Sequence, residues 1–162
     1  MIAPVEQLGS THNGAIMVGR GIVIARYWGG TSVEDVGLMR TGFESALDAS
    51  ANVALLIVID ESATAPDRQA RDALGRMLGD FSDRISAWAG SVAGTGLAAS
   101  SKRTLMRVVL SLARLRCPWV IQATPELASS WLSTTLQLRD GAHASAWLEG
   151  LRGARDDAAL PD

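Results

Sequence analysis

The feature that most constrains the fold is the run of residues 53–59, Val-Ala-Leu-Leu-Ile-Val-Ile, which is apolar at all seven positions and is followed by Asp60. A strand with one face in water would alternate apolar and polar residues, and this run does not. Continuous apolar strands are typical of parallel sheets whose two faces are both covered by helices. The run therefore predicts a central strand in an α/β protein.

The residues before this run predict two strands and one helix. Residues 15–18 and 21–28 are rich in β-branched and aromatic types, and the glycines at positions 19 and 21 suit a tight hairpin turn. Thr31 and Glu34 have the spacing of a capping box, which predicts a helix start. The apolar positions of that helix recur at spacings of three or four: Val33, Val36, Met39, Phe43 and Leu47.

The residues after the run predict an alternation of helices and short strands. We expect a helix from Pro66 towards Trp88, a strand over 91–98, and a largely apolar helix from Ser101 to Ala113. A short strand over 119–122, a helix opened by residues 124–126 and a C-terminal helix over 144–152 complete the pattern. The expected fold is a mixed α/β sheet of about five strands with four to five helices. It forms one domain over 1–162, with its core at about 15–135 and a frayed tail at 153–162.

Composition narrows the class of protein further. With 15 basic and 17 acidic residues, the net charge of -2 argues against a strongly basic nucleic-acid binder. No apolar stretch approaches the 18 or more residues of a membrane span, and residues 1–10 lack the pattern of a secretion signal. Cys117 is the single cysteine and cannot form an internal disulfide. We therefore predict a cytoplasmic protein without a membrane span.

The usual catalytic and cofactor patterns are missing. Hydrolytic triads and zinc sites need clustered histidines or cysteines, but His12 and His143 lie near opposite ends of the sequence. Residues 94–99 fit G-x-G-x-x-A, the phosphate turn of dinucleotide folds, yet no acidic residue lies between Asp83 and Glu126 to bind a ribose. Close packing of helix and strand is the favoured interpretation of these glycines. No catalytic residue, cofactor or metal is predicted.

A cluster of basic residues is the most distinctive charge feature. Six basic residues and no carboxylate lie between Arg84 and Pro125, which leaves nine basic against 17 acidic residues, a charge of -8, elsewhere. Because a helix N-terminus exposes free amides, the predicted start of the third helix is a candidate anion site. Internal pairing of these side chains with carboxylates of neighbouring helices is the alternative. The candidate anion-binding residues are Ser100, Ser101, Lys102, Arg103 and Arg107.

Several segments together resemble a known family. Residues 27–31 precede the first helix, 56–60 form the central strand, 66–71 open the second helix, and 93–96 precede the third. Residues 119–121 and 127–132 complete the pattern as a closing strand and a Trp-Leu helix. In this order the chain resembles the STAS superfamily, and more closely its SpoIIAA-like branch of small bacterial proteins. The resemblance covers about residues 15–132 and implies the fold; none of its motifs is catalytic.

The resemblance also implies a partner surface. In regulatory STAS proteins, a serine after an aspartate at the start of the second helix is phosphorylated by a partner kinase, which switches binding to an anti-sigma factor. Residues 65–68 here read Ala-Pro-Asp-Arg, so the Asp-Ser pair is missing, and Ser62 and Thr64 are the nearest hydroxyls. The surface implied is the loop before this helix with its first turn: Asp60, Glu61, Ser62, Thr64, Asp67 and Arg68.

These observations lead to a hypothesis and two alternatives. The hypothesis is a non-enzymatic protein-interaction module of bacterial signalling that lacks the phosphorylatable pair. The first alternative is a domain that binds a small anionic ligand or a lipid through the basic helix over 101–116. The second is an enzyme with an unrecognised activity. A homodimer formed through the apolar part of that helix, residues 105–115, is a separate interpretation, and core burial explains the same residues equally well.

Overall fold

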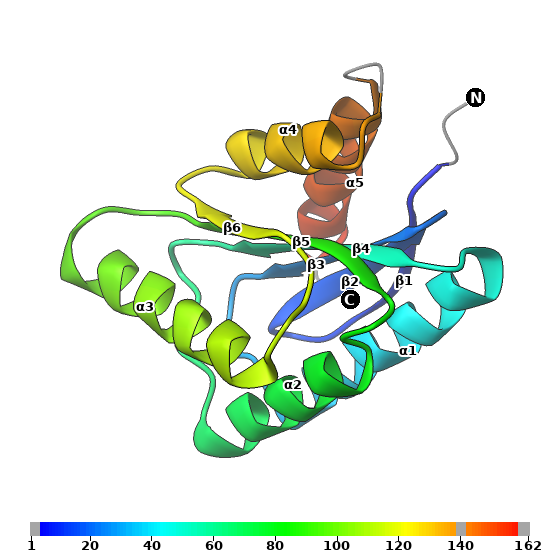
Figure 1. The fold of residues 1–162 in the computed structure, drawn as a ribbon. Helices are drawn as coiled ribbons and strands as arrows, with labels where there is room; N and C mark the ends of the chain where they lie inside the picture. Colours follow the sequence, from blue (N-terminus) through cyan, green and yellow to red (C-terminus); the bar gives the residue numbers. More distant parts are fainter. Residues whose placement is uncertain (1–3, 139–141, 159–162) are drawn as a thin grey trace.

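The computed structural model describes residues 4–138 and 142–158. Within these residues, six strands form one mixed sheet whose spatial order follows the chain (Figure 1). The first three strands pair antiparallel: β1 (Glu6–Ser10), β2 (Gly14–Gly19) and β3 (Ile22–Tyr27). The remaining strands continue parallel to β3: β4 (Val53–Ile59), β5 (Ile85–Val92) and β6 (Trp119–Gln122).

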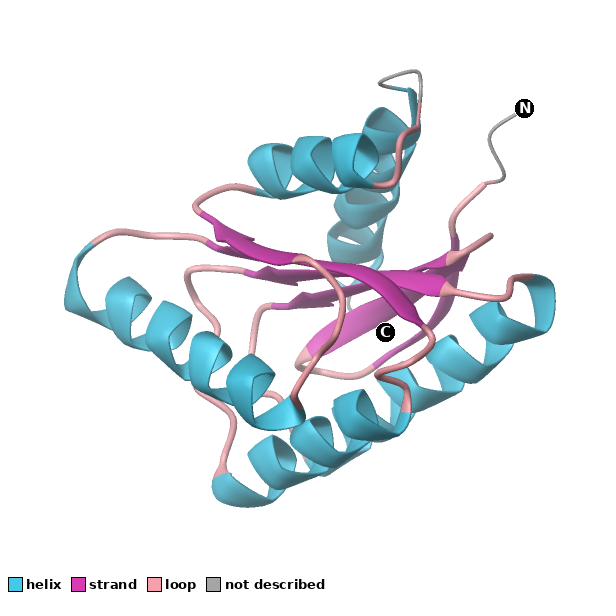
Figure 2. Ribbon diagram, viewed as in Figure 1, coloured by secondary structure: helices cyan, strands magenta, loops and turns pink. Residues whose placement is uncertain are grey.

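Helices cover both faces of the sheet (Figure 2). On one face lie α1 (Val33–Ala49), α2 (Arg68–Asp80) and α3 (Gly96–Ala113). On the other lie α4 (Pro125–Thr135) and α5 (Ala142–Ala158). β4 is buried at six of its seven positions and sends alternate side chains into the two cores. The prediction of a central strand covered on both sides is confirmed.

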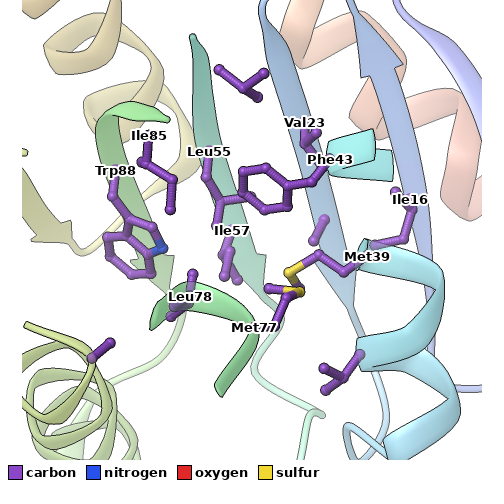
Figure 3. Close-up of a cluster of buried hydrophobic side chains, with 14 of the residues drawn as sticks. Ile16, Val23, Met39, Phe43, Leu55, Ile57, Met77, Leu78, Ile85 and Trp88 are labelled. Carbon is purple, nitrogen blue, oxygen red and sulfur yellow. The ribbon is translucent and has the colours of Figure 1, made fainter. Parts of the chain in front are cut away.

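The larger core packs α1 and α2 against the sheet. Phe43 is fully buried and its ring stacks on that of Phe81, with centroids 5.1 Å apart and planes 11° from parallel. Figure 3 shows Phe43 beside Leu55 of β4, with Met39 and Met77 next to each other in the same core. Close packing of this kind makes any loss of volume costly. This side of the sheet is therefore the rigid base of the loops described below.

One boundary predicted from the sequence is wrong. α2 ends at Asp80, and Ile85 and Trp88 belong to β5 instead of the helix. The backbone N–H of Phe81 donates to the carbonyl oxygens of Met77 and Gly79 and closes the helix there. The spacing of these apolar residues fits a helix, but pairing with β4 places them in a strand that is buried at seven of its eight positions. Residues 93–98, predicted as strand, form a turn and the start of α3.

Other element boundaries also differ. β1 was not predicted, because its mostly exposed sequence carries no apolar pattern. The helix cap of α1 is Ser32 with Asp35, one position after the predicted Thr31 and Glu34. α3 begins at Gly96, five residues before the predicted start. α5 continues to Ala158 where a tail was expected, while residues 159–162 of that tail lie outside the described residues.

No helix in the described part of the chain is both long enough and apolar enough to cross a membrane.

Candidate functional site

The candidate site lies where the parallel strands end. The segment after β4, residues 60–67, leads to α2 and is here called the β4–α2 loop. It lies beside the segment that follows β3, since Asp60 N–H donates to the carbonyl oxygen of Tyr27 at 2.8 Å. Open α/β sheets bind ligands and partners at this edge because loops there are free to vary.

Asp60 anchors the loop through an ion pair with Arg26. The Nε and Nη2 atoms of Arg26 donate to Asp60 Oδ1 and Oδ2, each at 3.2 Å, so the pair is bidentate. Arg26 Nη1 also donates to the carbonyl oxygen of Leu151 at 2.5 Å. The two charged side chains are only 14% and 11% exposed. One arginine thus joins β3, the residue after β4 and α5, and removing either charge would break a buried ion pair.

Two further contacts hold the loop in place. Ser62 Oγ donates to the carbonyl oxygen of Trp28 at 2.9 Å. Lys102 Nζ, from α3, donates to the carbonyl oxygen of Glu61, also at 2.9 Å. Asp67 then caps α2, because its Oδ1 accepts the N–H of Ala70 at 2.8 Å. The loop is fixed by its backbone while several of its side chains remain available.

The six predicted partner-binding residues therefore fall into two groups. Asp60 is buried in its ion pair. The other five are exposed, and Arg68 contacts Asp72 only across 3.9 Å with 88% of its side chain exposed. Exposed pairs of this kind contribute little to stability. The exposed residues are Glu61, Ser62, Thr64, Asp67 and Arg68.

The five predicted anion-binding residues do not converge on one point. Because α3 begins at Gly96, residues 100–102 lie inside the helix and not at its N-terminus. Arg103 Nη2 donates to the carbonyl oxygens of Val92 and Gly94, at 3.0 and 3.1 Å. Lys102 is bound to the loop as described, and Ser100, Ser101 and Arg107 are exposed. The internal pairing given as the alternative is present in part: Lys102 and Arg103 donate to carbonyl oxygens, while Arg116 of the same cluster contacts the carboxylate of Asp83 across 3.4 Å.

Sequence reasoning missed a buried polar cluster at the start of α1. Asp35 accepts hydrogen bonds from Thr11 Oγ1 at 2.5 Å, Asn13 Nδ2 at 3.0 Å, and both the N–H and the hydroxyl of Ser32 at 2.7 Å. Burial acts to raise the pKa of Asp35, but these hydrogen bonds outweigh it and hold the pKa below its ordinary value. With its oxygens occupied, this carboxylate stabilises the helix start and is not free for catalysis. The Ser32-x-x-Asp35 spacing is the signal that could have revealed it.

A small cavity lies between the sheet, α2 and α3. Its volume is about 70 Å³, and its mostly apolar lining includes Tyr27, Ile57, Trp88, Leu105 and Val109. The Tyr27 hydroxyl and the Trp88 indole N–H are buried without a hydrogen-bond partner, and burial, with Asp35 nearby, raises the pKa of Tyr27. A cavity that binds benzene measures roughly 150 Å³, so this space is small for a nucleotide or another cofactor.

The residues with reactive side chains are dispersed. His12 offers its carbonyl oxygen to the Trp28 indole N–H at 2.9 Å, and His143 lies on α5 against Trp147. Burial raises the pKa of the half-buried Cys117 thiol, which lowers its reactivity. In residues 4–138 and 142–158, no three His, Cys, Asp or Glu side chains are grouped so that they could hold a metal ion.

No protein-family model and no curated protein matches the chain. A solved structure does: the crystal structure of the diguanylate cyclase SiaD in complex with its activator SiaC from Pseudomonas aeruginosa. The match, to SiaC, covers 73% of this chain and 98% of that chain, with a TM-score of 0.53 and 14% sequence identity. The mixed α/β fold predicted from the sequence is confirmed. In that complex SiaC is the activator and SiaD is the diguanylate cyclase.

Proposed function

We propose that this chain is a non-enzymatic regulatory module of the STAS, SpoIIAA-like type that binds a protein partner through the β4–α2 loop and the first turn of α2. The fold likeness to an activator that works in complex with its partner supports the class of function. The bacterial signalling context follows from the resemblance of the sequence.

The observation that carries the proposal is a loop with a fixed backbone and exposed side chains. Three contacts hold it, from β3, from the residue after β3 and from α3: Arg26 to Asp60, Trp28 to Ser62, and Lys102 to Glu61. A surface already in its bound conformation loses little conformational entropy when a partner binds. The exposed carboxylates of Glu61 and Asp67 are the polar groups it presents.

The missing Asp-Ser pair changes how such a module is regulated. Ser62 donates its hydroxyl hydrogen to Trp28, so a phosphate there would break one of the contacts that hold the loop. Thr64 is exposed on the same loop. Partner binding by this chain therefore does not depend on phosphorylation at the usual position.

Affinity capture from a lysate of the source organism tests the proposal. Asp67→Asn removes the charge but keeps a residue that can cap α2, and Glu61→Lys reverses the second exposed charge. Glu149→Lys, an exposed site on α5 across the sheet, is the matched control. We expect one protein to be retained by the wild type and the control and to be at least tenfold depleted with the two loop variants. Equal retention by all four proteins would contradict the proposed surface.

A further inference from the structure

The third helix leaves large apolar side chains in solvent. On α3, Leu112 is 75% exposed and Val108 is 48% exposed, whereas only Ala99, Leu110 and Ala113 of this helix are buried. Leucine and valine side chains are stabilised when they move from water into an apolar environment. Side chains of this size gathered on one helix face indicate a binding surface.

These side chains form one wall of a groove. The groove lies between α2 and α3, measures about 550 Å³, and includes Leu105, Val108, Val109 and Leu112. Their spacing of three, four and seven residues places them on one stripe along about two turns of helix. A partner helix would contact such a stripe with its own residues at the same spacing.

The opposite wall, on α2, is basic and has an open position. The charged residues that line the groove are three arginines, Arg68, Arg71 and Arg76, and one carboxylate, Asp72. Their net charge is +2. Gly75 lies between them, and a Cβ atom built there would meet nothing within 4 Å. A backbone without a side chain at this point lets another helix approach closely.

We propose that this groove binds an amphipathic helix of a partner protein that carries acidic residues beside its apolar stripe. The inference rests on the proposed function, since it names the chemistry of the regulatory partner and a second surface that the partner occupies. Acidic side chains would face the arginines of α2, and leucine-like side chains would cover Val108 and Leu112. A second copy of this chain fits less well, because symmetric pairing of two such walls would bring like charges together.

The test uses two synthetic helical peptides of 21 residues. Both carry leucines at spacings of three and four, and the positions beside them are glutamate in one peptide and lysine in the other. Isothermal titration calorimetry should give a Kd at least tenfold lower for the glutamate peptide, and the difference should shrink as NaCl is raised. Equal affinity for the two peptides, or binding of neither, would overturn the proposal.

A pair of glycine variants locates the peptide. Gly75→Leu fills the groove and should weaken binding of the glutamate peptide at least tenfold. Gly79→Leu is the matched control, since Gly79 lies one turn further along α2, outside the groove, and also has open space around it. Both replace a helical glycine without positive φ, so neither variant is expected to lose stability. Unchanged binding by Gly75→Leu would overturn the proposal.

Two further measurements test the other candidate occupants of the groove, which are a second copy of this chain and a membrane surface. Sedimentation velocity that shows a wild-type dimer and a Gly75→Leu monomer would assign the groove to a second copy and overturn the partner helix. If the protein binds phosphatidylglycerol vesicles but neither peptide, and Gly75→Leu abolishes the vesicle binding, the groove would be assigned to a membrane surface and the partner helix would be overturned.

The outcome also separates this inference from the proposed function. A captured protein that is lost with Glu61→Lys and Asp67→Asn but kept with Gly75→Leu would leave the loop surface standing and overturn the groove. Peptide binding that depends on Gly75, with no protein captured through the loop, would overturn the proposed function and leave the groove.

Discussion

Two helices on the same face of the sheet, α1 and α3, have nearly the same length but opposite relations to the core. α1 begins with a capping box and buries six residues, among them Met39 and Phe43. The N-cap of α3, Thr95, makes no side-chain cap hydrogen bond, its C-cap, Arg114, is in the left-handed conformation, and the helix buries three residues. The comparison shows that the fold relies on α1 for stability and leaves α3 available for contacts outside the chain.

The largest expected difference is in the free energy of unfolding, between a substitution of a core residue of α1 and a substitution of a surface residue of α3. Phe43→Ala removes a fully buried ring stacked on Phe81 and should lower the free energy of unfolding by about 3–5 kcal/mol. Leu112→Ala removes a side chain that is 75% exposed and should change it by less than about 0.5 kcal/mol. Urea denaturation measures both. Equal losses would mean that α3 is as firmly packed as α1.

The cap of α1 should make stability depend on acid. The folded pKa of Asp35 lies below its unfolded value, so its contribution is present above the unfolded pKa and is lost as pH falls through the folded pKa. Asp35→Asn should cost about 1–2 kcal/mol at pH 7, because hydrogen bonds to a charged acceptor are lost. The difference between variant and wild type should shrink below about pH 4. Thermal unfolding across pH 2–7 measures it, and a constant difference would contradict the assignment.

The C-terminal cap of α3 offers a stabilising change. Arg114 has φ 52° and ψ 44°, a conformation that costs a side-chain-bearing residue more than glycine. Arg114→Gly should raise the free energy of unfolding by about 0.5–1 kcal/mol. Urea denaturation would show this as a higher midpoint with an unchanged slope, and a lower midpoint would show that the arginine side chain contributes more than its backbone costs.

The smallest expected effect concerns the uncapped start of α3. Thr95 has the extended backbone of an N-cap but its side chain accepts no helix N–H, and the first turn carries no acidic residue. Thr95→Asp should therefore stabilise the protein by about 0.5 kcal/mol through a cap bond and the helix dipole. The melting temperature should rise by a few degrees at low ionic strength. No rise would show that the cap is already satisfied in another way.

Local sequence patterns correctly predicted those elements whose burial in the fold matches the spacing of their apolar residues. The helix over α1 was predicted correctly because Val36, Met39 and Phe43 recur at helical spacing and are all buried. Its cap was misplaced by one residue, since Thr31–Glu34 and Ser32–Asp35 both have the spacing of a capping box. Only the contacts of Asp35 with Thr11 and Asn13 distinguish the second from the first.

The candidate site was predicted in part. The position of the β4–α2 loop at the end of a central strand follows from the apolar run before it, and five of its six predicted residues are exposed. The role of Asp60 could not be predicted, because Arg26 lies 34 residues away and meets it only once β3 pairs with β4. The contacts of Lys102 and Arg103 with carbonyl oxygens likewise depend on how α3 lies across the strand ends.

The sequence by itself determined the fold class, through the seven apolar residues of β4 and the helical spacing in α1. A strand buried on both faces is apolar throughout, and a helix buried on one face has apolar residues at every third or fourth position, so both kinds of burial can be recognised in the sequence. The tertiary structure decided the boundary between α2 and β5, since the spacing of Ile85 and Trp88 also fits a helix until the strand Ile85–Val92 pairs with β4. It also decided which side of α3 is covered. A largely apolar helix has no single face that its sequence marks for burial, so the position of α2 beside it leaves Val108 and Leu112 in solvent.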